Sequence, residues 1–160
     1  MKKVFMLAMV AFMTLTLSQK AFAIENPNPK GSKVLGIHAG GYPGFCANAT
    51  FDYTLVDSWW KGHFTVGGYV GFTHYSYWNY MAAMPRATYG LNITKDFEAH
   101  AGLMAGYAFW SYDGFHGDFV QGEIIGCRYY FTPKFGVEAE MNYIWPQYMS
   151  YFNVGVTIKL

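Results

Sequence analysis

Hydrophobic and polar residues alternate with a period of two along most of this chain. In residues 135–145, for example, the odd-numbered positions are all apolar or aromatic and the even-numbered positions are mostly polar or glycine. Such alternation is typical of a β-strand, in which successive side chains point to opposite faces of the sheet. Segments of this kind, separated by turn-forming residues, predict eight strands at residues 33–42, 45–56, 63–73, 86–93, 97–110, 119–131, 135–145 and 151–160.

The connections between these segments differ in length and composition. Those at 57–61, 94–96 and 132–134 are compact and charged, whereas those at 74–85 and 111–118 are longer and rich in aromatic residues. An even number of strands, joined by short turns on one side and longer loops on the other, is typical of outer-membrane barrels. The first connection is also short, so the contrast between the two sides is incomplete.

The charged positions of the strands share one face with many glycines. Asp52, for example, shares this face with Gly67 of the next predicted strand, and Glu98 shares it with Gly102 of its own predicted strand. Small residues beside charges fit the interior of an eight-stranded barrel, which is only wide enough for side chains to fill. The sequence therefore predicts an all-β fold, a closed antiparallel up-and-down eight-stranded transmembrane β-barrel with its apolar face toward lipid. A soluble, lipocalin-like periplasmic barrel is the alternative, and it predicts recovery in the soluble fraction.

The composition agrees with strands rather than helices. Aromatic residues make up 21% of the chain and glycine occurs 18 times, a bias that favours strands. Residues 62–85 lack Asp, Glu, Lys and Arg, but histidine, threonine and glycine interrupt any apolar helical face, so we reject a transmembrane helix there. Aromatic residues near strand ends predict two interfacial girdles, one with Trp59, Trp60, Tyr129 and Phe131 and the other with Trp110, Tyr112, Trp145, Tyr148 and Tyr151.

The N-terminus predicts export. Residues 1–3 are basic at two positions, residues 4–17 are apolar, and Ala21-Phe22-Ala23 is a small-x-small cleavage site, which together indicate a Sec-type signal peptide at 1–23. We expect a flexible periplasmic lead-in at 24–32 and one barrel domain at 33–160. Removing Lys2, Lys3 and Lys20 from the eleven basic residues leaves eight against ten acidic residues, and this balance, without a basic cluster, predicts no nucleic-acid partner.

Two segments carry a resemblance to a known family, "GCRYYFTPKFGVEAEMNY" at 126–143 and "YFNVGVTIKL" at 151–160. The chain resembles the small eight-stranded outer-membrane barrels of Gram-negative bacteria, the OmpA transmembrane domains, OmpX-like proteins and opacity-type proteins. The resemblance implies a place in the outer membrane in contact with its lipid, and biogenesis by the barrel-assembly machinery. The last segment resembles the signal read by that machinery, with Leu160 in place of the usual terminal Phe; its residues are Phe152, Val154, Val156, Ile158 and Leu160.

The charges on the inward face predict a network of ion pairs. Arg128 comes shortly before the 132–134 turn and should lie near Glu138 and Glu140, which follow it. Because an unpaired buried charge is costly, we expect these groups to pair and fill the lumen rather than to form a gate or a proton path. The predicted network consists of Asp52, Arg86, Glu98, Arg128, Glu138 and Glu140.

The histidines and cysteines give no metal or disulfide prediction. His38, His63 and His100 share the inward parity, but no local spacing suggests the three or four converging ligands of a metal site. We therefore predict neither a metal nor a cofactor. Cys46 and Cys127 have opposite parity on separate strands, which predicts two free thiols.

The loops are the remaining place for function. His74 and His116 lie near Ser76 and Ser111 in sequence, the one hint of a lipid-modifying enzyme, but no motif of such enzymes is present. We predict a monomer without catalysis, with a structural or surface-interaction role toward a host or extracellular ligand. The alternatives are a narrow channel for small hydrophobic or ionic solutes, as in OmpW-like barrels, and the lipid-modifying enzyme. The predicted extracellular aromatic rim consists of Tyr75, Tyr77, Trp78, Tyr80, Tyr112, Phe115 and Tyr148.

Overall fold

The chain forms eight β-strands. A computed structural model describes residues 26–41, 44–60, 62–76, 78–111, 114–145 and 149–160, so the predicted signal peptide lies outside the described residues. The strands are β1 (Lys33–Gly41), β2 (Phe45–Trp59), β3 (Gly62–Tyr75), β4 (Trp78–Asn92), β5 (Phe97–Ser111), β6 (Phe115–Tyr130), β7 (Phe135–Trp145) and β8 (Met149–Lys159).

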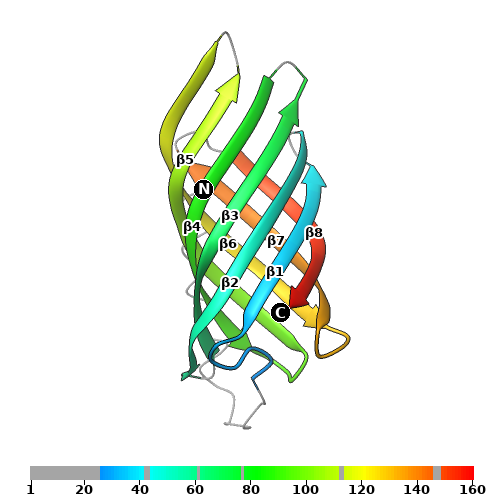
Figure 1. Ribbon diagram of the computed structural model, residues 1–160. Coiled ribbons are helices and arrows are strands. Elements are labelled where there is room, and N and C mark those ends of the chain that lie inside the picture. Colours follow the sequence, from blue (N-terminus) through cyan, green and yellow to red (C-terminus); the bar gives the residue numbers. More distant parts are fainter. Residues whose placement is uncertain (1–25, 42–43, 61, 77, 112–113, 146–148) are drawn as a thin grey trace, which may run out of the picture.

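The strands close into a barrel. Each one pairs in antiparallel fashion with the next along the chain, and β1 pairs with β8 to complete the ring (Figure 1). Closure leaves no unpaired sheet edge, which is the condition for a sheet to stand in lipid. The prediction of an up-and-down eight-stranded barrel is confirmed. Among the described residues there is no helix whose length and hydropathy would let it cross a membrane.

Burial follows the alternation of the sequence. Inward-facing residues such as His38 and Thr50 are buried, whereas outward-facing apolar residues such as Ile37, Val70 and Leu103 are more than half exposed. This is the reverse of a soluble protein, because the exposed wall is apolar and many of the buried residues are polar or charged. The apolar face therefore turns outward, as predicted.

The upper hairpins differ from the prediction. Residues 74–85 and 111–118 were expected to be long loops, but β3 continues to Tyr75, β4 begins at Trp78 and β6 begins at Phe115. The extra length comes from strand pairs that rise above the other hairpins at the upper end in Figure 1. The aromatic residues of these segments are thus held on paired backbone rather than on loops.

Pro85 accounts for the error in β4. Proline cannot donate a backbone hydrogen bond, so its presence argues against a central strand, and the predicted strand began after it. In the structure β4 passes through Pro85 while remaining paired with Gly68 of β3. On its other side the pairing with β5 skips Met84 and Pro85, between Ala83↔Tyr107 and Arg86↔Met104. The strand therefore accommodates Pro85 by an interruption of its pairing with β5, while its pairing with β3 continues.

The interior has two levels. The upper level is an apolar cluster that includes Met84 of β4 and Met104 of β5, and the lower level is polar. Tyr80, predicted in the extracellular rim, and Tyr151, predicted in an interfacial girdle, are 2% and 1% exposed and belong to this cluster instead. The alternation along β4 and β8 directs both side chains into the barrel, although both residues lie near strand ends. The apolar cluster consists of Cys46, Tyr69, Tyr80, Ala82, Met84, Met104, Ala108, Val120, Ile124, Ile144 and Tyr151.

Candidate functional site

The centre of the polar lower level lies on three neighbouring strands, β5, β6 and β7. The register places Arg128 of β6 directly opposite Glu98 of β5 on one side and Glu138 of β7 on the other. Arg128 donates from Nη1 to Glu98 Oε1 at 3.0 Å, and from Nη2 and Nε to the two oxygens of Glu138 at 2.8 and 3.1 Å. The short turn at 132–134 fixes this register, so a local sequence feature positions the centre of the network.

A second arginine joins the opposite wall. Arg86 of β4 lies 3.0 Å (Nε) from Asp52 Oδ1 and 2.9 Å (Nη2) from Glu140 Oε2. Asp52 also accepts from Arg128 Nη2 at 3.1 Å, so it links the two arginines. All six residues predicted for the network are therefore in contact, and their side chains are at most 3% exposed. Arg128 was expected near both glutamates, but Glu140 pairs with Arg86 across the barrel.

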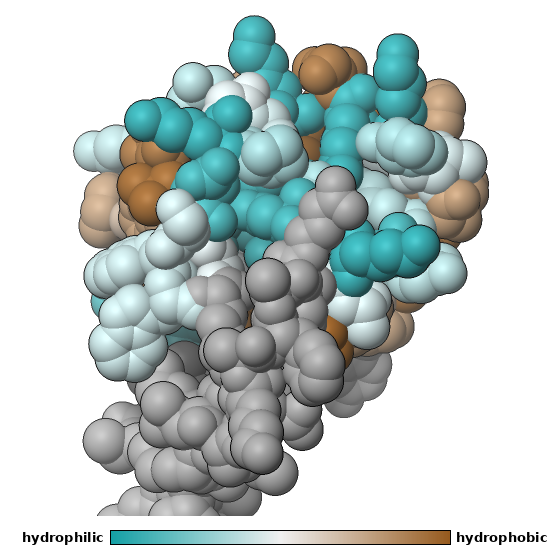
Figure 2. Space-filling view, turned by 90° about the horizontal axis from the view of Figure 1, so that it is seen from below, coloured by the Kyte–Doolittle hydropathy of each residue, from teal (hydrophilic) through white to brown (hydrophobic). Residues whose placement is uncertain are grey.

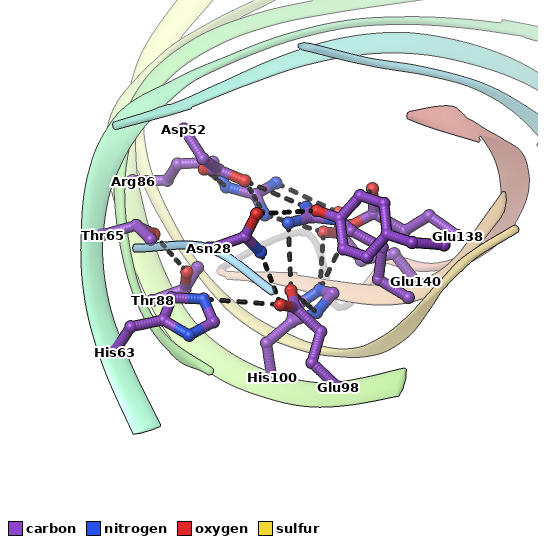
Figure 3. A network of polar contacts seen from close by, with 12 residues as sticks. Asn28, Asp52, His63, Thr65, Arg86, Thr88, Glu98, His100, Glu138 and Glu140 are labelled. Carbon is purple, nitrogen blue, oxygen red and sulfur yellow. Dashed lines mark hydrogen bonds and ion pairs between the residues drawn. The ribbon is translucent and has the colours of Figure 1, made fainter. Parts of the chain in front are cut away.

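Three histidines extend the network. His38 Nε2 lies 3.1 Å from Glu138 Oε2, and His63 Nε2 lies 3.5 Å from Glu98 Oε2. His100 Nε2 lies between two carboxylates, 3.3 Å from Glu138 Oε1 and 3.4 Å from Glu140 Oε2. In Figure 3 His100 lies close to Glu98, and His63 lies at the edge of the network, joined to it through Glu98. The sequence placed all three histidines on the inward face, but parity alone does not reveal which residues meet across the lumen.

Glycines make room for all three imidazole rings, and the glycine opposite His38 is Gly155. The register pairs His100 with Gly126 and His63 with Gly90. A Cβ added at Gly126 would lie 2.6 Å from His100 Nε2, and one at Gly90 would lie 2.5 Å from the His63 ring. Each ring therefore lies over a neighbouring strand where no side chain is present. This explains the mixture of glycine and charge on the inward face.

The residues before β1 close the lower end. Residues 24–32 were predicted as a flexible lead-in, but the described part, 26–32, makes defined contacts instead. Asn28 is 1% exposed, donates to Glu98 Oε2 at 2.6 Å and accepts from the Tyr130 hydroxyl at 3.0 Å. The Lys159 ammonium group donates to the Pro27 carbonyl and lies 3.7 Å from the centre of the Tyr130 ring. In the view from below, hydrophilic residues gather toward the middle of the described surface and hydrophobic ones lie along its edge (Figure 2).

The predicted aromatic rim is only partly described. Tyr77, Tyr112 and Tyr148 lie outside the described residues, as does the side chain of Phe115. Tyr75 and Trp78 lie together on the β3–β4 hairpin, with their ring centroids 5.4 Å apart. On the next hairpin Trp110 stacks on His116 with a centroid separation of 6.5 Å. The upper parts of the β3–β4 and β5–β6 strand pairs, residues 68–84 and 103–119, are almost uncharged. Among their described residues, Asp118 is the one acidic or basic side chain.

The serines and histidines of these hairpins do not form a nucleophile–base pair. His74 Nδ1 lies 2.8 Å from Asn79 Oδ1, and Ser111 Oγ accepts from the Asn79 backbone N–H at 3.2 Å. Among the serines whose side chains the structure describes, no hydroxyl is hydrogen-bonded to a histidine ring. The arrangement that would activate a serine is therefore missing from the described part of the upper end.

The middle of the outer wall carries polar side chains on β6. Gln121 and Glu123 of β6 point outward and line a shallow groove of about 550 Å³, together with Pro85 and Trp145. A carboxylate on a lipid-facing wall is unfavourable, and the effect depends on depth. The prediction of two free thiols agrees with the structure, with Cys46 buried in the interior cluster and Cys127 partly exposed. In the C-terminal segment Phe152, Val154, Val156 and Leu160 are exposed on the outward face and Ile158 is half-buried.

The comparisons with known proteins concern the fold. No family model matches this sequence, and no curated protein matches it. A designed transmembrane β-barrel has 13% identity and a TM-score of 0.60, covering 83% of this chain and 98% of that one. The N-terminal β-barrel domain of Pseudomonas aeruginosa OprF has 18% identity and a TM-score of 0.57, covering 82% and 98%. The Yersinia pestis outer membrane protein Ail has 12% identity and a TM-score of 0.54, covering 82% and 100%. At such identities the likeness establishes the fold, that of the small transmembrane β-barrels.

Proposed function

We propose that this chain is an integral outer-membrane barrel that acts through its upper surface, as a structural or surface-interaction protein without catalysis. The observation that carries the proposal is the distribution of charge. The lower level of the barrel holds the ion-pair network, whereas the β3–β4 and β5–β6 hairpins present an aromatic surface with Asp118 as its one described acidic or basic side chain. Such a surface favours contact with apolar or carbohydrate groups of a partner.

The filled interior supports a role outside the lumen. The apolar cluster occupies the upper level and the ion-pair network occupies the lower level, with Asn28 below it. A narrow channel, the first alternative, needs a continuous path through both levels. Among solved structures of this fold, Ail is named the attachment invasion locus protein, so the same barrel serves a protein whose name refers to attachment.

The membrane and the orientation can be tested together. An epitope inserted between β5 and β6 should be accessible to antibody on intact cells, and the same epitope inserted at 94–96, between β4 and β5, should be accessible only after the outer membrane is opened. Cell fractionation should recover both proteins with the outer membrane. Recovery of the protein in the soluble fraction would favour the lipocalin-like alternative.

The surface role has its own test. Cells that produce the protein are compared for adherence to cultured epithelial cells and to immobilised glycans, with the variants Tyr75→Ser and Trp78→Ser. We expect each variant to reduce adherence severalfold, because these half-buried aromatic rings are expected to supply much of the contact area. Phe131→Ser is the matched control, since Phe131 is 59% exposed at the opposite end. Equal adherence of cells with and without the protein would contradict the proposal.

A further inference from the structure

The interior charges do not balance. Asp52, Glu98, Glu138 and Glu140 supply four carboxylates, and Arg86 and Arg128 are the only guanidinium groups in contact with them among the described residues. With neutral imidazoles the network therefore carries two excess negative charges. The Lys159 ammonium group near the lower end, bound to the Pro27 carbonyl and the Tyr130 ring, supplies one positive charge close to Glu98, so at least one negative charge stays uncompensated. An uncompensated buried charge costs several kcal/mol, so the interior requires additional positive charge.

Three side chains converge where that charge is missing. One nitrogen of His100 and one oxygen each of Glu138 and Glu140 lie within 4.8 Å of one another. The two distances from His100 Nε2 to these oxygens are 3.3 and 3.4 Å. In a tetrahedral zinc site with bonds of about 2.0–2.1 Å, neighbouring ligand atoms are separated by about 3.3–3.4 Å. These two distances match the edge of a tetrahedron, the two carboxylate oxygens lie within 4.8 Å of each other, and a water molecule would complete four ligands.

The hydrogen-bonding needs of His100 point the same way. Ionised carboxylates only accept hydrogen bonds, so the Nε2 that faces Glu138 and Glu140 must carry the proton. In a neutral imidazole ring the other nitrogen, Nδ1, is then unprotonated. That Nδ1 lies 4.0 Å from Glu98 Oε1 and has no hydrogen-bond partner, although the residue is 5% exposed. A cation on Nε2 would move the proton to Nδ1, where it faces Glu98. A metal-bound imidazole commonly directs its other N–H to a carboxylate in this way.

The candidate ligands are held by an outer shell. Arg128 donates to both oxygens of Glu138, and His38 contacts its Oε2. Arg86 donates to Glu140 Oε2, so the arginines also bind the candidate ligand oxygens Glu138 Oε1 and Glu140 Oε2. Gly126 provides the space beside His100 Nε2. Such outer-shell contacts fix the orientation of metal ligands, and they distinguish this cluster from exposed acidic groups that merely lie near one another.

We propose that His100, Glu138 and Glu140 bind a divalent metal ion of the zinc type inside the barrel, with water as the fourth ligand. The ion has a structural role, since it neutralises the excess charge and joins β5 to β7. The proposal concerns the lower level of the interior and holds whatever partner the upper surface binds. The rival explanation is a second proton on the imidazoles of His38 and His100, which would supply the same charge without a metal.

The test measures metal and stability together. The full barrel is refolded in detergent with excess Zn²⁺ or with chelator, and bound metal is counted by mass spectrometry after gel filtration. We expect one zinc per chain and a zinc-dependent rise in the urea midpoint, because a ligand that binds only the folded state stabilises it. Refolding with Co²⁺ should give the visible absorption bands of a tetrahedral site.

Two variants separate the site from nonspecific binding. His100→Gln should lose the metal and the zinc-dependent shift, whereas His63→Gln, which changes a buried histidine outside the three ligands, should retain both. If His100→Gln does not fold, the bound metal and the urea midpoint of the wild type, measured with zinc and with chelator, still test the proposal. Absence of stoichiometric metal in the wild type, or the same zinc effect in both variants, would overturn the proposal. Equal stabilisation by mild acid with no metal bound would assign the charge to protons instead.

Discussion

At the scale of single residues, Arg128 shows how the interior depends on pairing. It contacts Glu98, Glu138 and Asp52, all buried. Arg128→Met should destabilise the barrel by about 3–5 kcal/mol, because removal of one partner leaves buried carboxylates uncompensated. Urea unfolding in lipid vesicles, followed by tryptophan fluorescence, measures this cost. Adding Glu138→Gln to Arg128→Met should recover part of the loss, whereas additive losses would show that the two residues do not interact.

Glu123 predicts an effect of opposite sign. It points outward from the middle of β6 and lines the groove beside Gln121. Glu123→Leu should stabilise the barrel by about 1 kcal/mol in vesicles, because acidic side chains on a lipid-facing wall are unfavourable, although less so than basic ones. The matched control is Glu98→Leu, the same substitution on the inward face, which should destabilise. A stability loss with Glu123→Leu would mean that a partner for this carboxylate exists in the bilayer.

At the scale of elements, the segment before β1 is part of the barrel's stability. Asn28 hydrogen-bonds both Glu98 and Tyr130 at the lower end. Asn28→Ala should therefore cost about 1.5–3 kcal/mol, the range for a hydrogen bond to a charged group. Asn26→Ala serves as the control and should cost less, because the Asn26 side chain bonds backbone groups, the Asp57 carbonyl and the Asn28 N–H, at partly buried positions. Equal effects of the two variants in urea unfolding would argue against a closing role for Asn28.

The sequence predicted some elements better than others for physical reasons. Period-two alternation is a local property, so all eight strands and the inward parity of the six network residues could be derived from it. The upper part of β4 could not, because Pro85 breaks the rule for central strands and only the lost pairing with β5 shows how it is tolerated. Residues 26–32 have no periodicity, so their contacts under the lumen left no signal in the sequence.

Contacts across the lumen were the least predictable part of the site. Arg128 and Glu138 are joined by a short turn, so their contact follows from the sequence. Glu140 pairs with Arg86, 54 residues away, and this choice depends on the diameter and stagger of the closed barrel. The convergence of His100 with Glu138 and Glu140 has the same origin, which is why no spacing in the sequence announced it.

At the scale of the whole molecule, the apolar cluster and the ion-pair network each fill the lumen. We therefore predict that the barrel does not conduct ions. Arg128→Ala opens part of the polar level, but Met84 and Met104 of the apolar level remain. We therefore expect wild type and Arg128→Ala to be equally silent in planar bilayers. Arg128→Ala combined with Met84→Ala and Met104→Ala should give small, discrete conductance steps, because long side chains that fill both levels are then removed. Steps from wild type would favour the channel alternative, and steps from Arg128→Ala alone would show that the polar level is the only barrier.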